Sequence, residues 1–170
     1  QIPKETTSKN VKNVEKKVRS YANIAIIKYW GKKNEKKMIP ATSSISLTLE
    51  NMYTETEISF ISEDESIKVI GEPGDVFYLN SELQDKEQRD KISNVINLFR
   101  KDKSQAVKIY TVNNMPTEAG LSSSSSGLSA VIKACNKLFE KKMSRKELAQ
   151  ISKFGSGSSS RSFFGPVSAW

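Results

Sequence analysis

The sequence contains no histidine and only one cysteine, Cys135, among its 170 residues. A Ser-His-Asp triad, a Cys-His pair and a His-ligated zinc site therefore cannot be built from this chain. The cysteine has no partner for an internal disulfide, and its place in an apolar helical pattern predicts a small core residue rather than a nucleophile. The sequence also lacks an apolar run of bilayer length and the residue pattern of a signal peptide. We therefore expect a cytoplasmic protein without a membrane partner.

Composition and charge narrow the class further. Hydrophobic residues make up 36% and charged residues 27% of the chain, which predicts one folded domain with a core of ordinary size. The net charge of +8 favours an anionic partner, which could be nucleic acid, a membrane surface or a small molecule. No long basic stripe alternates with aromatic residues, so nucleic acid is the weaker of these interpretations.

A serine-rich stretch, residues 116–127, reads Pro-Thr-Glu-Ala-Gly-Leu-Ser-Ser-Ser-Ser-Ser-Gly. A strand-like run over 106–112 precedes it, and apolar residues at helical spacing follow it from Leu128 to Phe139. This order places the unpaired amides and the positive end of a helix beside the loop, which suits a phosphate group. No Gly-Lys-Ser/Thr follows, so the loop is not of the Walker type. A flexible Ser/Gly linker is the alternative.

Hydrophobic periodicity predicts the other elements. Residues 1–15 show no period and are expected to form a frayed tail. The expected strands are 19–30, 45–50, 54–60, 106–112 and the residues just before Trp170, with a short hairpin made of 67–70 and 76–79. Helices are expected at 84–101, 128–139 and 144–154, the last opened by a capping box. Since no polar tail follows Trp170, we expect the chain to be part of a longer protein.

Two polar residues, Asn23 and Lys28, interrupt the otherwise apolar strand 19–30. Burying them is costly unless they have partners. They belong either to a site or to the framework, with Asn23 capping a turn and Lys28 reaching solvent. The residues Tyr29-Trp30-Gly31-Lys32 follow at once. Lysines on both sides of such a turn are suited to gripping a phosphate as point charges.

A second glycine–serine stretch covers residues 155–162 and reads Gly-Ser-Gly-Ser-Ser-Ser-Arg-Ser. A linker is again one interpretation, but the apolar residues 163–167 and Trp170 follow closely. The planar guanidinium of Arg161 can bind a carboxylate or phosphate through two hydrogen bonds. A binding segment is therefore the stronger interpretation.

Three stretches together resemble one enzyme family. Residues 21–32, Tyr-Ala-Asn-Ile-Ala-Ile-Ile-Lys-Tyr-Trp-Gly-Lys, resemble the N-terminal signature of mevalonate diphosphate decarboxylases. Residues 116–125 resemble the phosphate loop of the GHMP kinase superfamily, and 155–162 resemble the decarboxylases' Gly-Ser-Gly-Ser-x-Ser-Arg-Ser segment. The resemblance runs from about Tyr21 to Trp170 and covers only the first half of such an enzyme.

The resemblance implies a fold and a reaction. The fold is α+β, of the ribosomal protein S5 domain 2-like type, with a mixed β-sheet and helices packed on one side. Residues 1–18 would be a flexible extension and 19–170 a GHMP-type N-terminal domain, with the C-terminal GHMP domain outside this chain. The family phosphorylates the 3-hydroxyl of mevalonate 5-diphosphate with ATP and Mg2+, and loss of phosphate and CO2 gives isopentenyl diphosphate. A homodimer is expected for the full-length protein.

The resemblance also assigns roles to individual residues. The ATP phosphates would be cradled by Gly120, Ser122, Ser123 and Ser124, with Ser124 near Mg2+. The substrate would be held by Tyr29, Lys32, Ser156, Ser158 and Arg161. The catalytic candidates are Arg161, Lys28 and Asn23, with Arg161 orienting the substrate carboxylate. This use of cations fits phosphoryl transfer, which depends mainly on alignment and charge compensation.

One residue that the family requires is missing. Its catalytic aspartate lies in the C-terminal half, so the chain alone is expected to be inactive. Two alternatives remain open from the sequence. The first is a related phosphomevalonate decarboxylase or mevalonate 3-kinase, and the second is a non-catalytic nucleotide- or RNA-binding module.

Overall fold

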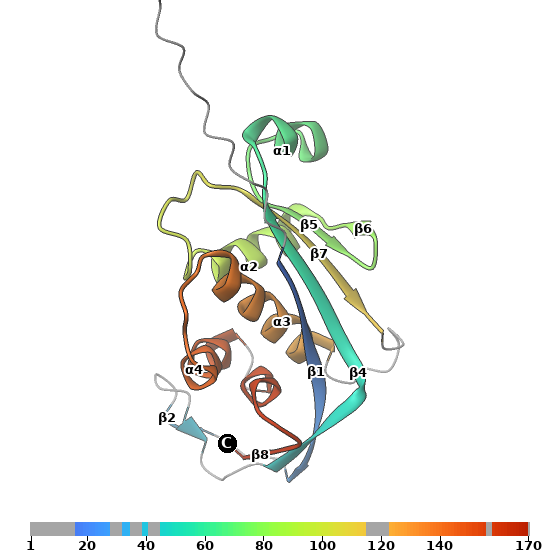
Figure 1. The fold of residues 1–170 in the computed structure, drawn as a ribbon, viewed down its shortest axis with the longest axis vertical. Coiled ribbons are helices and arrows are strands. Elements are labelled where there is room, and N and C mark those ends of the chain that lie inside the picture. The colour runs from blue at the N-terminus through green and yellow to red at the C-terminus, as the bar shows by residue number, and fades with distance from the viewer. Residues whose placement is uncertain are drawn as a thin grey trace, which may run out of the picture.

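The main sheet runs through the whole molecule (Figure 1). The computed structural model describes residues 16–27, 32–34, 39–40, 45–114, 123–155 and 158–169. The strand order is β1, β4, β7, β5, β6, and β8 also pairs with β4. The bounds are β1 Lys16–Ile27, β4 Ile45–Phe60, β5 Val76–Leu79, β6 Glu82–Leu83, β7 Val107–Asn113 and β8 Val167–Ala169. The β5–β7 pair is parallel and the others are antiparallel, so the sheet is mixed, as predicted. A separate pair joins β2 (Lys32–Asn34) to β3 (Ile39–Pro40).

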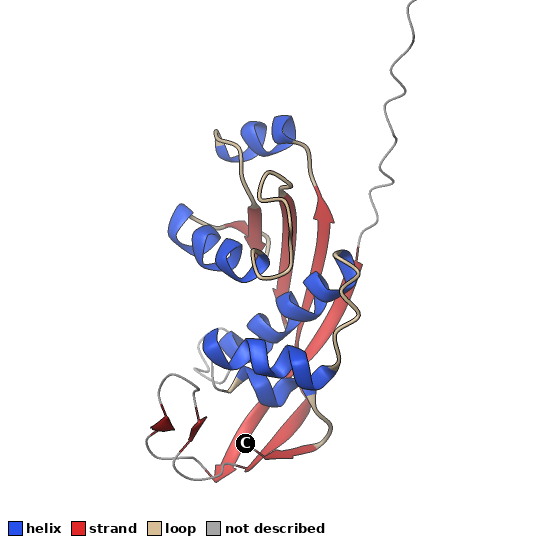
Figure 2. Cartoon of the chain, turned by 90° about the vertical axis from the view of Figure 1, so that its left-hand side faces the viewer, coloured by secondary structure: helices blue, strands red, loops and turns tan. Residues whose placement is uncertain are grey.

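The helices lie on one side of this sheet, as Figure 2 shows. They are α1 Glu63–Ile70, α2 Lys86–Ile96, α3 Ser123–Leu138, α4 Arg145–Gly155 and the 3-10 helix η2 Ser159–Phe163. The longest, α3, packs against β1 and β4, and α4 packs against α3 and η2. The predicted α+β fold is therefore confirmed. None of the described helices has both the length and the apolar character that a bilayer span requires.

The hydrophobic core lies between α3 and the sheet. Its largest fully buried apolar side chains are Phe99, Ile58, Ile96, Ile109, Ile132, Val76, Val107, Val131 and Cys135. Burial raises the pKa of the Cys135 thiol to about 12, so the sulfur stays protonated. Cys135 is therefore a core residue, as the sequence predicted.

The predicted hairpin of 67–70 with 76–79 is wrong. Residues 67–70 form the last turn of α1, and β5 pairs with β7 and β6 instead. A capping box opens α1, because Ser62 accepts a hydrogen bond from the Glu65 amide and the Glu65 carboxylate accepts one from the Ser62 amide. Gly71, with φ of 77°, closes the helix in the left-handed conformation. These caps outweigh the β-branched residues at 67–70.

The strands predicted at 45–50 and 54–60 are one continuous strand, β4. Apolar and polar residues alternate at its start, a pattern that normally buries the apolar residues, but the structure shows the opposite. Ile45 and Leu47 are 36% and 39% exposed, whereas Ser46 is 1% exposed. Leu47 pairs with Ile24 of β1 on one side and with Val167 of β8 on the other. Both of these residues are exposed as well, so all three strands leave the same face open.

In β1, too, the apolar residues are not the ones that are buried throughout. Its side chains Ile24 and Ile26 are 43% and 60% exposed, and Asn23 is 4% exposed. The strand begins at Lys16, three residues before its predicted start, so the expected boundary after Val18 falls inside β1. The register shifts between Tyr21 and Ala22, which changes the face that the later residues occupy.

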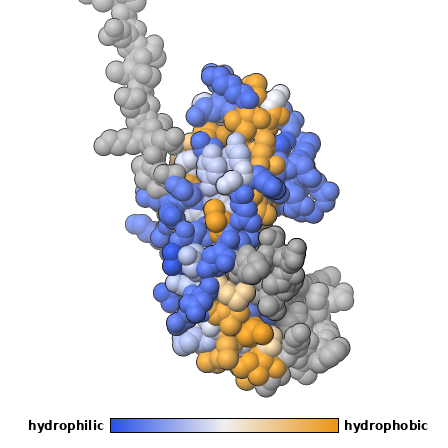
Figure 3. All heavy atoms as spheres, turned by 90° about the vertical axis from the view of Figure 1, so that its right-hand side faces the viewer, coloured by the Kyte–Doolittle hydropathy of each residue, from blue (hydrophilic) through white to orange (hydrophobic). Residues whose placement is uncertain are grey.

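Apolar side chains gather on the open face of the sheet, which Figure 3 views directly. One group of them lies at its lower end, where Figure 1 places β8, the end of β1 and the start of β4. The exposed apolar residues of these strands are Ile24, Ile26, Ile45, Leu47 and Val167. No described helix covers them.

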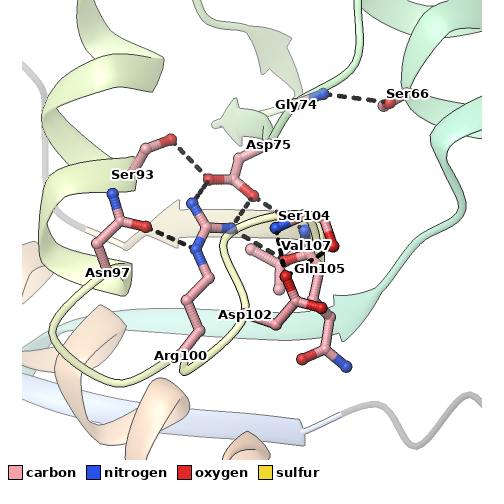
Figure 4. A network of polar contacts seen from close by, with 10 residues as sticks. All are labelled: Ser66, Gly74, Asp75, Ser93, Asn97, Arg100, Asp102, Ser104, Gln105 and Val107. Atoms are coloured by element: carbon pink, nitrogen blue, oxygen red, sulfur yellow. Dashed lines mark hydrogen bonds and ion pairs between the residues drawn. The ribbon is translucent and has the colours of Figure 1, made fainter.

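A buried ion pair links the segment after α2, which carries Arg100, to Asp75, the residue before β5 (Figure 4). Arg100 donates two parallel hydrogen bonds to Asp75, at 2.8 and 2.9 Å, and the two side chains are 6% and 4% exposed. Asp75 also accepts from the Ser93 hydroxyl at 2.6 Å and from the Val107 amide at 3.0 Å. The remaining Arg100 Nε donates to Asn97 Oδ1. None of the buried side-chain nitrogen and oxygen atoms of the described residues lacks a hydrogen-bond partner. Through Ser93, Asp75 and Val107, this network therefore links α2, β5 and β7.

Candidate functional site

Asn23 joins β1 to η2 beneath the covering helices. Its amide nitrogen donates to Ser162 Oγ at 2.8 Å and to the Ser158 carbonyl at 3.2 Å. Its amide oxygen accepts from Arg161 Nε at 3.2 Å. Two of the stretches singled out in the sequence, 138 residues apart, therefore meet through one side chain. Asn23 lies within β1, opposite Thr48, and does not cap a turn.

Burial explains why an amide suits this position. Asn23 is 4% exposed and Arg161 is 6% exposed. A neutral amide can offer both donors and an acceptor in one plane, and a buried polar group is tolerated when it is bonded in this way. The side chain therefore fixes the Arg161 guanidinium relative to the sheet.

The 3-10 helix η2 does not behave as a linker. All five of its residues are buried, between 0% and 6% exposed. Ser159 Oγ donates to the Ser152 carbonyl of α4 at 3.1 Å, which ties η2 to that helix. The linker interpretation of this part of the second glycine–serine stretch is therefore wrong, and Ser158 and Arg161 lie in a packed segment.

Arg161 reaches a small hollow between α4 and η2. The hollow has a volume of about 140 Å3 and is lined by Lys146, Ala149, Gln150, Lys153, Ser160, Arg161 and Phe164. These lining residues include three cations and no acid, which favours an anionic ligand. The sequence analysis missed Lys146 and Lys153. Their spacing with Gln150 on one face of the predicted helix was the available signal.

The serine run divides into two parts at the start of α3. Ser125, Ser126 and Ser129 are fully buried against the sheet. Ser126 Oγ shares a 2.8 Å hydrogen bond with Thr54 Oγ1, so these serines are framework. The helix itself starts at Ser123, and its first amides have no intrahelical acceptor. An anion-binding end of α3 at this point is consistent with the sequence prediction.

Several predicted site residues cannot be placed. Lys28, Tyr29, Gly120, Ser122 and Ser156 lie outside the described residues. Lys32 belongs to β2, and Ser123 and Ser124 open α3, but their side chains also lie outside the described part. Of the predicted set, the structure brings together Asn23, Ser158 and Arg161.

A second hollow, missed from the sequence, lies beside the first turns of α3. It has a volume of about 340 Å3 and lies between α2, β5, β7 and α3. Its lining residues are Phe77, Leu79, Gln88, Lys91, Ile92, Thr111, Asn113, Gly127, Leu128 and Val131. An apolar hollow with a few polar groups is typical of a small-molecule binding site.

Within the described part of the chain, no group of three or more His, Cys, Asp or Glu side chains could hold a metal ion. A metal site built only from these protein ligands is therefore not found there. A hydroxyl near a phosphate-binding helix end remains compatible with Mg2+, which commonly takes most of its ligands from phosphates and water.

Comparison with known proteins gives one consistent result. The family described as "Diphosphomevalonate decarboxylase-like N-terminal domain" matches residues 20–170. The curated diphosphomevalonate decarboxylase of Gibberella zeae is 35% identical over 156 residues, covering 87% of this chain and 41% of that protein. The chain thus spans about 41% of the length of this relative.

Solved structures agree with the sequence matches. A mevalonate pyrophosphate decarboxylase from Streptococcus pyogenes is 57% identical, with a TM-score of 0.81, covering 94% of this chain and 48% of that one. A structure of MDDEF in complex with MVAPP, AMPPCP and magnesium is 42% identical, with a TM-score of 0.76. It covers 92% of this chain and 46% of that one.

Proposed function

Because this chain belongs to the diphosphomevalonate decarboxylase-like N-terminal domain family, we propose that the whole protein converts mevalonate 5-diphosphate to isopentenyl diphosphate. The reaction would consume ATP and belong to the mevalonate pathway of isoprenoid biosynthesis. The observation that carries this proposal is the buried contact between Asn23 and Arg161. It brings together two stretches that the sequence independently predicts to bind substrate.

The substrate side of the proposed site is built around Arg161. The guanidinium is held through Nε by Asn23, and a planar guanidinium in a fixed orientation is suited to a carboxylate. The cations lining the adjacent hollow, Lys146 and Lys153, add positive potential for a substrate with several negative charges. The substrate diphosphate would be held by Tyr29, Lys32, Ser156 and Ser158, with Lys28 and Asn23 at the reaction centre.

The nucleotide side is built around the start of α3. The ATP phosphates would lie at its first amides, with Gly120, Ser122, Ser123 and Ser124 around them and the Ser124 hydroxyl near Mg2+. The hollow between α2, β5, β7 and α3 would take the adenine ring, since Phe77, Leu128 and Val131 supply apolar walls. Support comes from the solved complex with AMPPCP, an ATP analogue, and magnesium.

The proposed chemistry needs positioning and charge compensation. ATP with Mg2+ would supply phosphorylation of the 3-hydroxyl. Phosphate then leaves with the electron pair of its C–O bond, while the bond to the carboxylate breaks and its pair forms the new double bond. Arg161 holds the carboxylate in line with the departing group, and Asn23 keeps Arg161 in place. The aspartate that accepts the hydroxyl proton would come from outside this chain.

The test is an assay of the full-length protein with ATP and each of three substrates: mevalonate 5-diphosphate, mevalonate 5-phosphate and mevalonate. We expect isopentenyl diphosphate, CO2 and ADP from the first alone. Release of CO2 from the monophosphate only, or phosphorylation of mevalonate without CO2, would replace the proposal with one of the related activities. Salt-dependent RNA binding without binding of ATP or mevalonate 5-diphosphate would overturn it.

Residues 1–170 tested alone should form no isopentenyl diphosphate, because the proposed proton acceptor is missing. Detectable product would contradict that expectation. The resemblance further leads us to propose a homodimer of the full-length protein, a cytoplasmic location and a flexible extension that ends before β1. Sedimentation, fractionation and limited proteolysis would test these three proposals.

A further inference from the structure

Lys133 lies in α3 where this helix meets both β1 and η2. Its ammonium nitrogen donates to the Ser162 carbonyl at 3.1 Å and to Ser20 Oγ at 3.2 Å. The same nitrogen lies 5.2 Å from the centre of the Phe163 ring, within the range of a cation–π contact. One side chain therefore links the covering helix to the two segments that carry Asn23 and Arg161.

Partial burial of the Lys133 ammonium group costs free energy of desolvation. None of the ion pairs found among the described residues includes it. Burial, together with the positive charges of Arg145 and Lys137, lowers the pKa of Lys133 to about 8. The hollow beside it, of about 780 Å3, also presents Arg19 and Glu50. An apolar side chain would avoid the desolvation cost, so the stability of the fold alone does not account for this lysine.

The two acceptors of Lys133 are close to the proposed site along the chain and in space. Ser162 directly follows Arg161, and its hydroxyl accepts from the Asn23 amide. Ser20 lies on β1, three residues before Asn23, and its hydroxyl also forms a hydrogen bond with that of Ser129 in α3. Lys133 bonds the backbone of η2 at the Ser162 carbonyl, while Asn23 bonds the side chains of Ser162 and Arg161.

We propose that Lys133 is a positioning residue, which fixes η2 against β1 and thereby sets the Arg161 guanidinium for the substrate carboxylate. The part that concerns substrate rests on the proposed function. The part that concerns η2 does not, because it follows from the hydrogen bonds alone.

The test compares the full-length wild type with Lys133→Met. Methionine has a side chain of similar length but lacks the charge and the hydrogen-bond donors. Hydrogen exchange at the Arg161 and Phe164 amides, which are bonded within η2, should become at least about tenfold faster. The KM for mevalonate 5-diphosphate should rise about tenfold, as expected for one lost contact of ordinary strength. The KM for ATP should stay within about twofold. Lys133→Arg, which retains charge and donors, should recover most of the loss.

The matched control is Lys137→Met, which removes the same charge from an exposed position one turn along α3 and should leave both measurements unchanged. Unchanged exchange at Arg161 and Phe164 in Lys133→Met would overturn the proposal. An equal rise in the KM of both substrates would also overturn it, since that indicates general loosening. If Lys133→Met does not fold, Lys133→Gln is measured in its place. A wild type without turnover refutes the proposed function, and the exchange result still decides whether Lys133 holds η2.

Discussion

The two faces of the sheet carry different side chains near the proposed site, although the hydrophobic core packs on the same covered face further along the strands. Beneath α3, the strands bury the hydroxyl groups of Ser20, Thr54, Thr56 and Thr111, and α3 itself buries those of Ser126 and Ser129, each at most 3% exposed. On the open face, the same strands expose aliphatic groups, with Ile26 and Val167 both 60% exposed. The polar side is the packed side near the site, and the apolar side is open.

The difference lies in what each kind of contact can fix. Apolar contacts are not directional, whereas a buried hydroxyl pair is satisfied in only one register, because a shift leaves both groups without a partner. Thr54 with Ser126 and Ser20 with Ser129 thus set the position of α3 on β4 and β1. The proposed ATP side lies at the start of α3 and the proposed substrate side between β1 and η2. The hydroxyl layer therefore positions one relative to the other.

On the covered side, we expect the largest loss of stability when the ion pair of Asp75 and Arg100 is broken. Asp75→Ala leaves the Arg100 guanidinium buried without its carboxylate, so the free energy of unfolding should fall by about 3–5 kcal/mol. Urea denaturation measures this. Glu87→Ala, which removes the exposed partner of Lys91, is the control and should cost at most about 0.5 kcal/mol. Equal losses in the two variants would show that burial of the Asp75 pair does not matter.

The lowered pKa of Lys133 predicts that the difference in stability between the wild type and Lys133→Met changes with pH. This pKa is about 8 in the folded protein and close to 10.5 in the unfolded chain, so the unfolded state binds more protons between these pH values. Wild-type stability should therefore rise with pH in this window relative to Lys133→Met, by about 2 kcal/mol in total after allowance for partial exposure. Urea midpoints at pH 7, 8, 9 and 10 measure it. A constant difference would mean that the lysine titrates normally.

The hydroxyl layer can be examined with a double-mutant cycle at Thr56 and Thr111, whose hydroxyls are 3.0 Å apart. Thr56→Val leaves a buried hydroxyl without this partner and should cost about 1–2 kcal/mol. Thr56→Val combined with Thr111→Val should cost less than the sum of the two single changes. Additive costs would indicate that the two groups do not form a pair.

The smallest effect is expected on the open face. In residues 1–170, Ile26→Thr should change the free energy of unfolding by less than about 0.5 kcal/mol, because Ile26 is 60% exposed. Thermal unfolding of the two proteins measures the difference. A loss above about 1 kcal/mol would show that another part of the protein packs on this face.

The sequence predicts α2, α3, α4, β5 and β7 because apolar residues recur with a clear period and lie against the core. It fails at 67–70, where the caps at Ser62 and Gly71 decide the structure. It also fails on the orientation of Ile45 and Leu47, since alternation shows that a strand has two kinds of face but not which one a helix covers.

Asn23 and Arg161 could be singled out from the sequence because Asn23 is a polar residue in an otherwise apolar strand and Arg161 is a lone cation among serines. Lys133 could not be, because a lysine on a helix is most often a solvated charge. Its distinguishing feature is the pair of acceptors, Ser20 and Ser162, and these come from segments far away in the sequence. Such contacts can be recognised only when the chain is folded.

The most direct test of the proposed site is kcat/KM for mevalonate 5-diphosphate in the full-length protein with Arg161→Lys, measured beside Arg145→Lys. Lysine at 161 keeps the charge but loses the planar fork, and Arg145 is exposed at the start of α4. The account predicts a fall of about a hundredfold for Arg161→Lys, which corresponds to about 2.7 kcal/mol. The Arg145 variant should stay within about twofold. Equal values for the two variants would contradict a substrate-orienting role for Arg161.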